Sequence, residues 1–190
     1  MVENIKLKII ESHEEILNII NKNVGTLVNF DWHADYPLCP ERILDVDTYS
    51  DMVTTNHSAW FDNNWVPILV SRGYVSQYIW FYPHDCVKDD IKTFKSKKGD
   101  CIVYNIRFNR KAKVSYKYIT IDMDFIGCKV PMIWYPDNRK ELFMNIIKCL
   151  TARNVTLIIS KSKKYTNFDP GIFLDNVMED ISNIANVEII

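Results

Sequence analysis

Apolar residues occur along this chain in short runs separated by segments with helical periodicity. Five runs have the length and the β-branched or aromatic content of strands that are largely buried, and they cover 26–30, 78–82, 101–106, 118–122 and 155–159. Segment 6–10 alternates as a half-buried strand does, and 187–190 ends the chain with a similar pattern. The pattern therefore predicts seven strands, with 89–94 left as a short ambiguous stretch.

Helices are predicted between these strands. Ser12 and Glu15 form a capping-box pattern before apolar residues at helical spacing, so a helix is expected to begin at Ser12. A second is expected over 56–73, with Pro67 dividing or kinking it, and a third after Asp137 as its cap. The last is expected over about 170–183. This succession of strands and helices predicts one domain, 1–190, built as a three-layer α/β/α sandwich with a largely parallel sheet.

Two of the strands end in acidic residues. The run 26–30 is followed by Asp31, His33 and Asp35, and the run 118–122 ends in Asp122 and Asp124. Residues two apart on extended backbone face the same way, so each set is expected to converge at the carboxyl end of its strand. Four carboxylates and an imidazole in one place repel one another unless cations are bound. The oxygen-rich set favours Mn²⁺, and its size suits two ions.

Composition excludes several other classes of protein. The net charge of −1, with acids and bases interspersed, gives no basic footprint for nucleic acid. No basic leader is followed by an apolar stretch, and no run approaches the ~18 apolar residues of a membrane span, so a cytoplasmic protein without membrane contact is expected. The five cysteines include no Cys-x-x-Cys pair, which indicates reduced thiols rather than a disulfide framework or a structural zinc site.

The two acidic motifs resemble those of the arginase–deacetylase superfamily. Segment 30–35 resembles its Asp-Ala-His-x-Asp motif, segment 121–124 resembles its later Asp-x-Asp motif, and the order is the same. Segment 12–15 resembles the place where arginases carry their first histidine ligand. The resemblance implies one manganese ion held by His13, Asp31, Asp35 and Asp122, and a second held by Asp31, His33, Asp122 and Asp124.

Within that superfamily, the short chain is similar to a compact arginase-like family that includes peptide arginases. Such enzymes convert arginine side chains in a peptide to ornithine and release urea, so the implied partner is an arginine-containing peptide. The resemblance makes Asp31 and His33 participants in catalysis and suggests His57 as the general acid, with His84 as a second candidate. The oligomeric state is left open.

Four further residues are candidates for substrate binding. A guanidinium group pairs best with a carboxylate, which Glu11 or Asp169 could supply. Tyr165 and Thr166 follow the strand 155–159 and are expected to border the cleft.

Other functions remain as alternatives. A zinc deacetylase of the same fold would use fewer carboxylates. Calcineurin-like phosphoesterases also begin with Asp-x-His, as in Asp31 and His33, but their intervening motif is missing here. Haloacid-dehalogenase phosphatases carry an Asp-x-Asp after a strand but do not account for 31–35. A protein that binds metal without catalysis is the remaining alternative.

Overall fold

The computed structural model of this protein is built on one eight-stranded sheet. The structure describes residues 2–36, 46–47, 50, 65–83, 88–129 and 136–190. Along the sheet the strands lie in the order β4-β5-β3-β2-β6-β7-β1-β8. All neighbouring pairs are parallel except β4 and β5. The strands are β1 (Asn4–Ile10), β2 (Gly25–Phe30), β3 (Val75–Tyr82), β4 (Asp90–Phe94), β5 (Cys101–Arg107), β6 (Tyr118–Asp122), β7 (Asn154–Ser160) and β8 (Asn186–Ile189).

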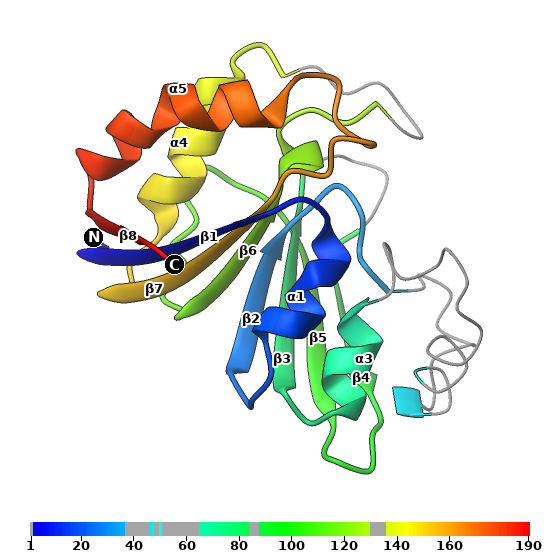
Figure 1. Cartoon of the computed structure of the whole chain (residues 1–190). Coiled ribbons are helices and arrows are strands. Elements are labelled where there is room, and N and C mark those ends of the chain that lie inside the picture. Colours follow the sequence, from blue (N-terminus) through cyan, green and yellow to red (C-terminus); the bar gives the residue numbers. More distant parts are fainter. Residues whose placement is uncertain (1, 37–45, 48–49, 51–64, 84–87, 130–135) are drawn as a thin grey trace.

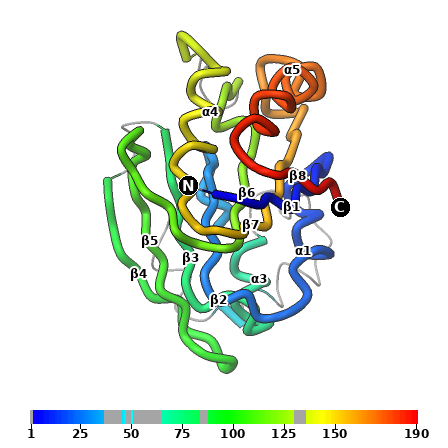
Figure 2. Tube along the Cα trace, turned by 90° about the vertical axis from the view of Figure 1, so that its left-hand side faces the viewer, coloured from blue at the N-terminus to red at the C-terminus, as the bar shows by residue number. Residues whose placement is uncertain are grey.

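Helices cover both faces of the sheet, as Figure 1 shows. The helices α4 (Arg139–Cys149) and α5 (Pro170–Ser182) lie together on one face. The helices α1 (Ile16–Ile19) and α3 (Trp65–Ser71) lie together on the other. In the view turned by 90°, the two pairs stand apart with the sheet between them (Figure 2). The predicted three-layer α/β/α sandwich is thereby confirmed.

Each face of the sheet has its own hydrophobic core. The core under α4 and α5 includes Phe30 of β2 and Ile121 of β6, both fully buried. The core under α1 and α3 includes Leu27 of β2 and Trp80 of β3. Alternate residues of β2 therefore point to opposite cores, as the two-residue period of a strand requires. None of the described helices is both long and apolar enough to cross a membrane.

The order in which the chain adds strands to the sheet reverses between the parallel neighbours β2 and β6. From β2 the chain proceeds to β3 and β5 on one side, and from β6 to β7 on the other. Because the crossovers that leave the two strands go to opposite faces, a crevice forms outside their carboxyl ends, which is where open α/β sheets bind ligands. Strands β2, β6, β7 and β1 are neighbours there, so the segments that follow all four meet at one edge.

Some local expectations need correction. The segment after Ser12 begins as a 3₁₀ turn, η1 (His13–Glu15), before α1, and Glu15 Oε1 accepts the backbone N–H groups of Glu11 and Ser12. Asn138, not Asp137, is the N-cap of α4, because its side chain accepts from the N–H of Glu141. The ambiguous stretch 89–94 forms the antiparallel edge strand β4.

Of the helix expected over 56–73, the described part is α3. Pro67 is its third residue, a position where the missing N–H of proline costs no helical hydrogen bond. The rest of that expectation falls outside the described residues.

Candidate metal centre

The acidic residues after β2 converge through a turn, not through extended backbone as the sequence suggested. β2 ends at Phe30, and His33 donates its backbone N–H to Asp31 Oδ1 at 2.7 Å, which bends the chain back. Asp35 has a φ of 54°, in the left-handed region that is uncommon for residues other than glycine. Such strain at a buried acid is typical of functional sites.

The second acidic pair is arranged similarly. Asp122 ends β6, and Asp124 lies in the 3₁₀ turn η4 (Met123–Phe125) that follows at once. Asp122 Oδ1 caps this turn by accepting the N–H of Asp124 at 3.3 Å. The turn directs both carboxylates toward the end of β2, where Trp32 donates its N–H to Asp124 Oδ1 at 3.1 Å.

His13 is the centre of the first cluster, which we call the inner position. Its Nδ1 lies 3.0 Å from Asp31 Oδ2, 3.0 Å from Asp35 Oδ2 and 3.1 Å from Asp122 Oδ2. All four side chains are buried. Yet neither ring nitrogen of His13 has a partner with hydrogen-bond geometry among the described residues. Three carboxylate oxygens thus surround a nitrogen that no hydrogen bond satisfies.

His33 is the centre of the second cluster, the outer position. Its Nδ1 lies 2.7 Å from Asp124 Oδ2 and 3.9 Å from Asp31 Oδ1, and its side chain is 25% exposed. Asp124 is fully buried, and its Oδ2 has no hydrogen-bond partner among the described residues. The thiol of Cys128 also belongs here, because one ligand atom each of His33, Asp124 and Cys128 lie within 4.8 Å of one another.

Buried polar groups hold the carboxylates in place. Asn29 Nδ2 approaches Asp31 Oδ2 at 3.1 Å and Asp35 Oδ2 at 3.2 Å, and Asn29 Oδ1 accepts from the Thr120 hydroxyl at 2.6 Å. On the other side, the Ser162 hydroxyl donates to Asp122 Oδ2 at 2.8 Å. Neighbouring strands and the loop after β7 therefore supply hydrogen-bond partners that orient the carboxylates, as such partners do around metal ligands.

The concentration of acids changes the protonation of the whole cluster. Burial raises the pKa of Asp31 to about 8, with the carboxylates of Asp35 and Asp122 adding to the rise. Burial also raises the pKa of Asp124 to about 6. For His33, burial acts to lower the pKa, but the contact with Asp124 outweighs it and raises the value to about 10. Without a cation, the cluster must therefore hold protons at neutral pH.

His13 responds in the same way. Burial by itself lowers its pKa, but the carboxylates of Asp35 and Asp122 raise it well above the ordinary value. A divalent cation would replace those protons, and the donor set suits one, since carboxylate oxygens and imidazole nitrogens are ligands of hard and borderline metals. The residues present therefore fit a metal at the inner position, and His33, Asp124 and Asp31 fit one at the outer position.

A hollow of about 180 Å³ lies beside both positions. It is lined by Glu11, Glu14, Tyr165 and Lys163, among others, together with His13 and His33. The predicted candidates Glu11 and Tyr165 thus lie at the site, and the Tyr165 ring meets the His33 ring edge-on, with centroids 5.8 Å apart.

The other predicted candidates lie elsewhere. Asp169 caps α5, where its Oδ1 accepts the N–H groups of Gly171 and Ile172. Thr166 is buried, and its hydroxyl donates to the carbonyl oxygen of Phe168 at 3.2 Å. Neither borders the hollow beside the metal positions. His57 and His84 lie outside the described residues, so their catalytic roles stay predictions.

Sequence reasoning missed three contributors. Glu14 borders the hollow, and its buried Oε2 has no hydrogen-bond partner among the described residues. Ser162 supports Asp122, and Cys128 lies at the outer position. Ser162 follows β7, whose carboxyl end was predicted to lie at this edge, so the strand order was a usable signal for it. Cys128 follows Asp124 by four residues, but nothing in that spacing alone marks a ligand.

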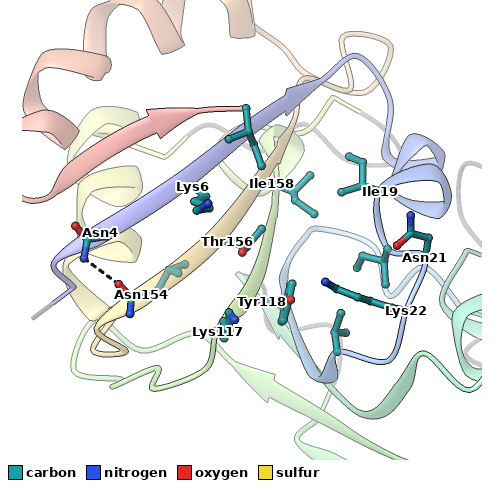
Figure 3. A pocket seen from close by; sticks show the side chains of 14 residues that line it. Asn4, Lys6, Ile19, Asn21, Lys22, Lys117, Tyr118, Asn154, Thr156 and Ile158 are labelled. Carbon is teal, nitrogen blue, oxygen red and sulfur yellow. Dashed lines mark hydrogen bonds between the residues drawn. The ribbon is translucent and has the colours of Figure 1, made fainter.

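A second hollow, of about 540 Å³, is remote from these residues (Figure 3). It lies between β1, β7 and the segment after α1, and the side chains of Lys6, Lys22 and Lys117 border it. Lys6 is paired with Glu188 at 3.4 Å. The charge there is cationic, opposite to that of the metal positions, so the two hollows differ in chemistry.

Comparison with known proteins adds no assignment. A scan against protein-family models and a search of curated proteins gave no match to this chain. Any statement about function therefore depends on the residues described above.

Proposed function

We propose that this protein is a binuclear metal-dependent hydrolase of the ureohydrolase type, which converts arginine residues of a peptide to ornithine and urea with two Mn²⁺ ions. The observation that carries the proposal is the convergence of two histidines and four aspartates at the ends of adjacent strands, with His13 surrounded by three carboxylate oxygens at 3.0–3.1 Å. Three carboxylate oxygens around one imidazole form a buried set with an excess of negative charge, which favours a bound cation.

Two divalent ions would supply an activated water near neutral pH and stabilise the negative charge that develops in the transition state. The chain's own residues would divide the remaining work. His13, Asp35 and Asp122 would hold the inner ion, His33 and Asp124 the outer one, and Asp31 would face both. Ser162 and Asn29 would keep the carboxylates oriented.

The substrate's cation would be recognised by carboxylates at the hollow. Glu11 lies at the mouth, with 65% of its side chain exposed, and its Oε1 accepts from Lys161 Nζ at 2.7 Å. This hydrogen bond lowers the pKa of Glu11, which as an exposed carboxylate is ionised at neutral pH. Glu14 adds a second carboxylate within the hollow. An acceptor at the surface suits an arginine that belongs to a peptide.

The test begins with metal content and then measures urea released from an arginine-containing peptide. We expect two ions per chain and manganese-dependent urea release. The variants Glu11→Gln and Glu14→Gln should lower kcat/KM by at least about tenfold with metal content unchanged, because each removes a charge-assisted contact with the guanidinium. Asp169→Asn is the matched control, since its carboxylate caps α5.

Each outcome is informative. A chain that binds no metal at neutral pH would overturn the proposal. Two bound ions without urea release would overturn the substrate assignment, and hydrolysis of an acetylated lysine peptide would then identify the deacetylase alternative.

A further inference from the structure

The outer position differs from the inner one by a sulfur atom. Ligand atoms of His33, Asp124 and Cys128 lie within 4.8 Å of one another, and Cys128 is fully buried. The Asp124 carboxylate is also buried, and its Oδ2 lies 2.7 Å from His33 Nδ1 without hydrogen-bond geometry to any described residue. A thiol next to an imidazole and a buried carboxylate is a typical set of metal ligands.

The backbone keeps Cys128 in this place. Cys128 forms an isolated antiparallel bridge with Thr166, and the Asn167 side-chain amide donates to the carbonyl oxygen of Cys128 at 3.2 Å. The preceding Gly127 approaches Asn167 so closely that a Cβ there would lie 2.6 Å from Asn167 Oδ1. A larger residue at Gly127 would force the Asn167 side chain to move, and this side chain holds the carbonyl group of Cys128.

We propose that Cys128 is a protein ligand of the outer cation, together with His33 and Asp124, and that the outer position therefore prefers Zn²⁺ or another borderline cation over Mn²⁺. This inference rests on the proposed function in using its outer position, and it replaces the Mn²⁺ proposed there by a more thiophilic cation. The inner position keeps an oxygen-rich set around His13 and retains the preference for Mn²⁺. The protein would thus bind two different metals.

The distances are compatible with direct ligation. Zn–S and Zn–N bonds of about 2.3 and 2.0 Å allow two ligand atoms of one ion to lie up to roughly 4.3 Å apart. Atoms now within 4.8 Å of one another need to close by about half an ångström at most. A side-chain rotation of that size requires no movement of the backbone bridge at Cys128.

The other described cysteines offer matched controls. Cys149 ends α4 and Cys101 begins β5, and neither belongs to a described group of metal-binding side chains. Burial raises the pKa of both thiols to about 12, so they stay protonated and poor in reactivity.

Cobalt substitution gives a direct readout. Co²⁺ bound to a thiolate shows an intense charge-transfer band in the near ultraviolet, whereas nitrogen and oxygen ligands alone do not. We expect this band in the full-length protein loaded with two equivalents of Co²⁺, and in Cys149→Ser. It should be lost in Cys128→Ser, which should still bind cobalt at the inner position and should bind Zn²⁺ at least about tenfold more weakly.

The outcomes separate this inference from the proposed function. Two bound cobalt ions without the band, or a band that persists in Cys128→Ser, would overturn the role of Cys128 and leave the hydrolase proposal standing. The band together with no urea release would support Cys128 as a ligand and overturn the substrate assignment of the proposed function. A Cys128→Ser protein that fails to fold is recognised by its circular dichroism, and Cys128→Ala then serves as the second variant.

Discussion

The inner and outer positions are built from the same motifs but differ in exposure and ligand chemistry. Around His13 every partner is a carboxylate oxygen, and all of these side chains are buried. The His33 side chain is 25% exposed and borders the hollow, and the Cys128 thiol lies near the Asp124 carboxylate. Both positions border the hollow, so the comparison indicates that they differ in ligand chemistry and in the exposure of the histidine rather than in access.

Asp31 is the residue that links the two positions, and its loss should have the largest effect. Its Oδ2 faces His13 at 3.0 Å and its Oδ1 faces His33 at 3.9 Å. We expect Asp31→Asn to weaken the binding of both ions by at least about 100-fold, because a ligand matters more than the supporting residues around it. Metal content after gel filtration measures this, and Asp35→Asn should lose the inner ion only, because among the described contacts its carboxylate pairs with His13 and not with His33.

An Asp31→Asn protein that still retains one ion would contradict the bridging role. Misfolding is not the expected cause of metal loss in this variant. Asparagine has the same shape, and it removes a buried acid whose pKa is raised to about 8, so the metal-free variant should be at least as stable as the metal-free parent near neutral pH.

The stability of the metal-free protein should fall with rising pH, whereas the stabilisation added by bound metal should increase. In the metal-free protein the folded-state pKa values of Asp31 and His33, about 8 and about 10, exceed their ordinary values of 3.8 and 6.5. Protonation therefore favours the folded state, and stability should fall as the pH rises through these windows. Metal binding requires deprotonated ligands, so the stabilisation by added metal should grow with pH.

The expected size of this effect follows from binding linkage. Metal at about 100 times its Kd stabilises by about 2.7 kcal/mol, which corresponds to roughly 5–10 °C in Tm for a chain of this length. Thermal unfolding with a chelator and with Mn²⁺ at about pH 6 and about pH 9 measures it. A difference in Tm that stays constant across this range would show that the buried acids are not the metal ligands.

The sequence predicted the architecture well, because periodicity is a local property that survives folding. The parallel sheet and the succession of strands and helices followed from the apolar runs, and the meeting of the segments after β2 and β6 followed from the carboxyl-end rule. The local geometry was less accessible. Asp35 was expected on extended backbone, but its φ of 54° is in the left-handed region. The turn that precedes it is closed by the hydrogen bond from the His33 N–H to Asp31 Oδ1.

Residues that reach the site through long-range packing were not predictable in this way. Cys128 arrives because its backbone pairs with Thr166, a contact between segments that are distant in sequence. Asp169 had a suitable side chain for a guanidinium, yet the chain uses it as the N-cap of α5. A carboxylate before Pro-Gly at a helix start is typical of a cap, and that local signal was available.

The smallest expected effect is that of removing the Ser162 hydroxyl, which should weaken metal binding at the inner position and not at the outer one. Ser162 donates to Asp122 Oδ2, the oxygen that lies 3.1 Å from His13 Nδ1, whereas Asp122 Oδ1 is engaged by the N–H of Asp124. Ser162→Ala should therefore weaken the inner ion by about tenfold and leave the outer ion unchanged, since a supporting hydrogen bond typically contributes 10–100-fold. Competition with a chromophoric chelator measures both affinities.

Ser162→Ala should not change the backbone strain at this position. Ser162 has a φ of 42°, and alanine is no better suited to that conformation than serine, so the substitution changes the hydroxyl alone. Ser160→Ala is the control, because the Ser160 hydroxyl contacts Ser162 Oγ at 2.8 Å but makes no described contact with Asp122. Equal losses of affinity for the two ions would mean that Asp122 acts through Oδ2 on both of them. Asp122 would then link the inner and outer positions, as Asp31 does.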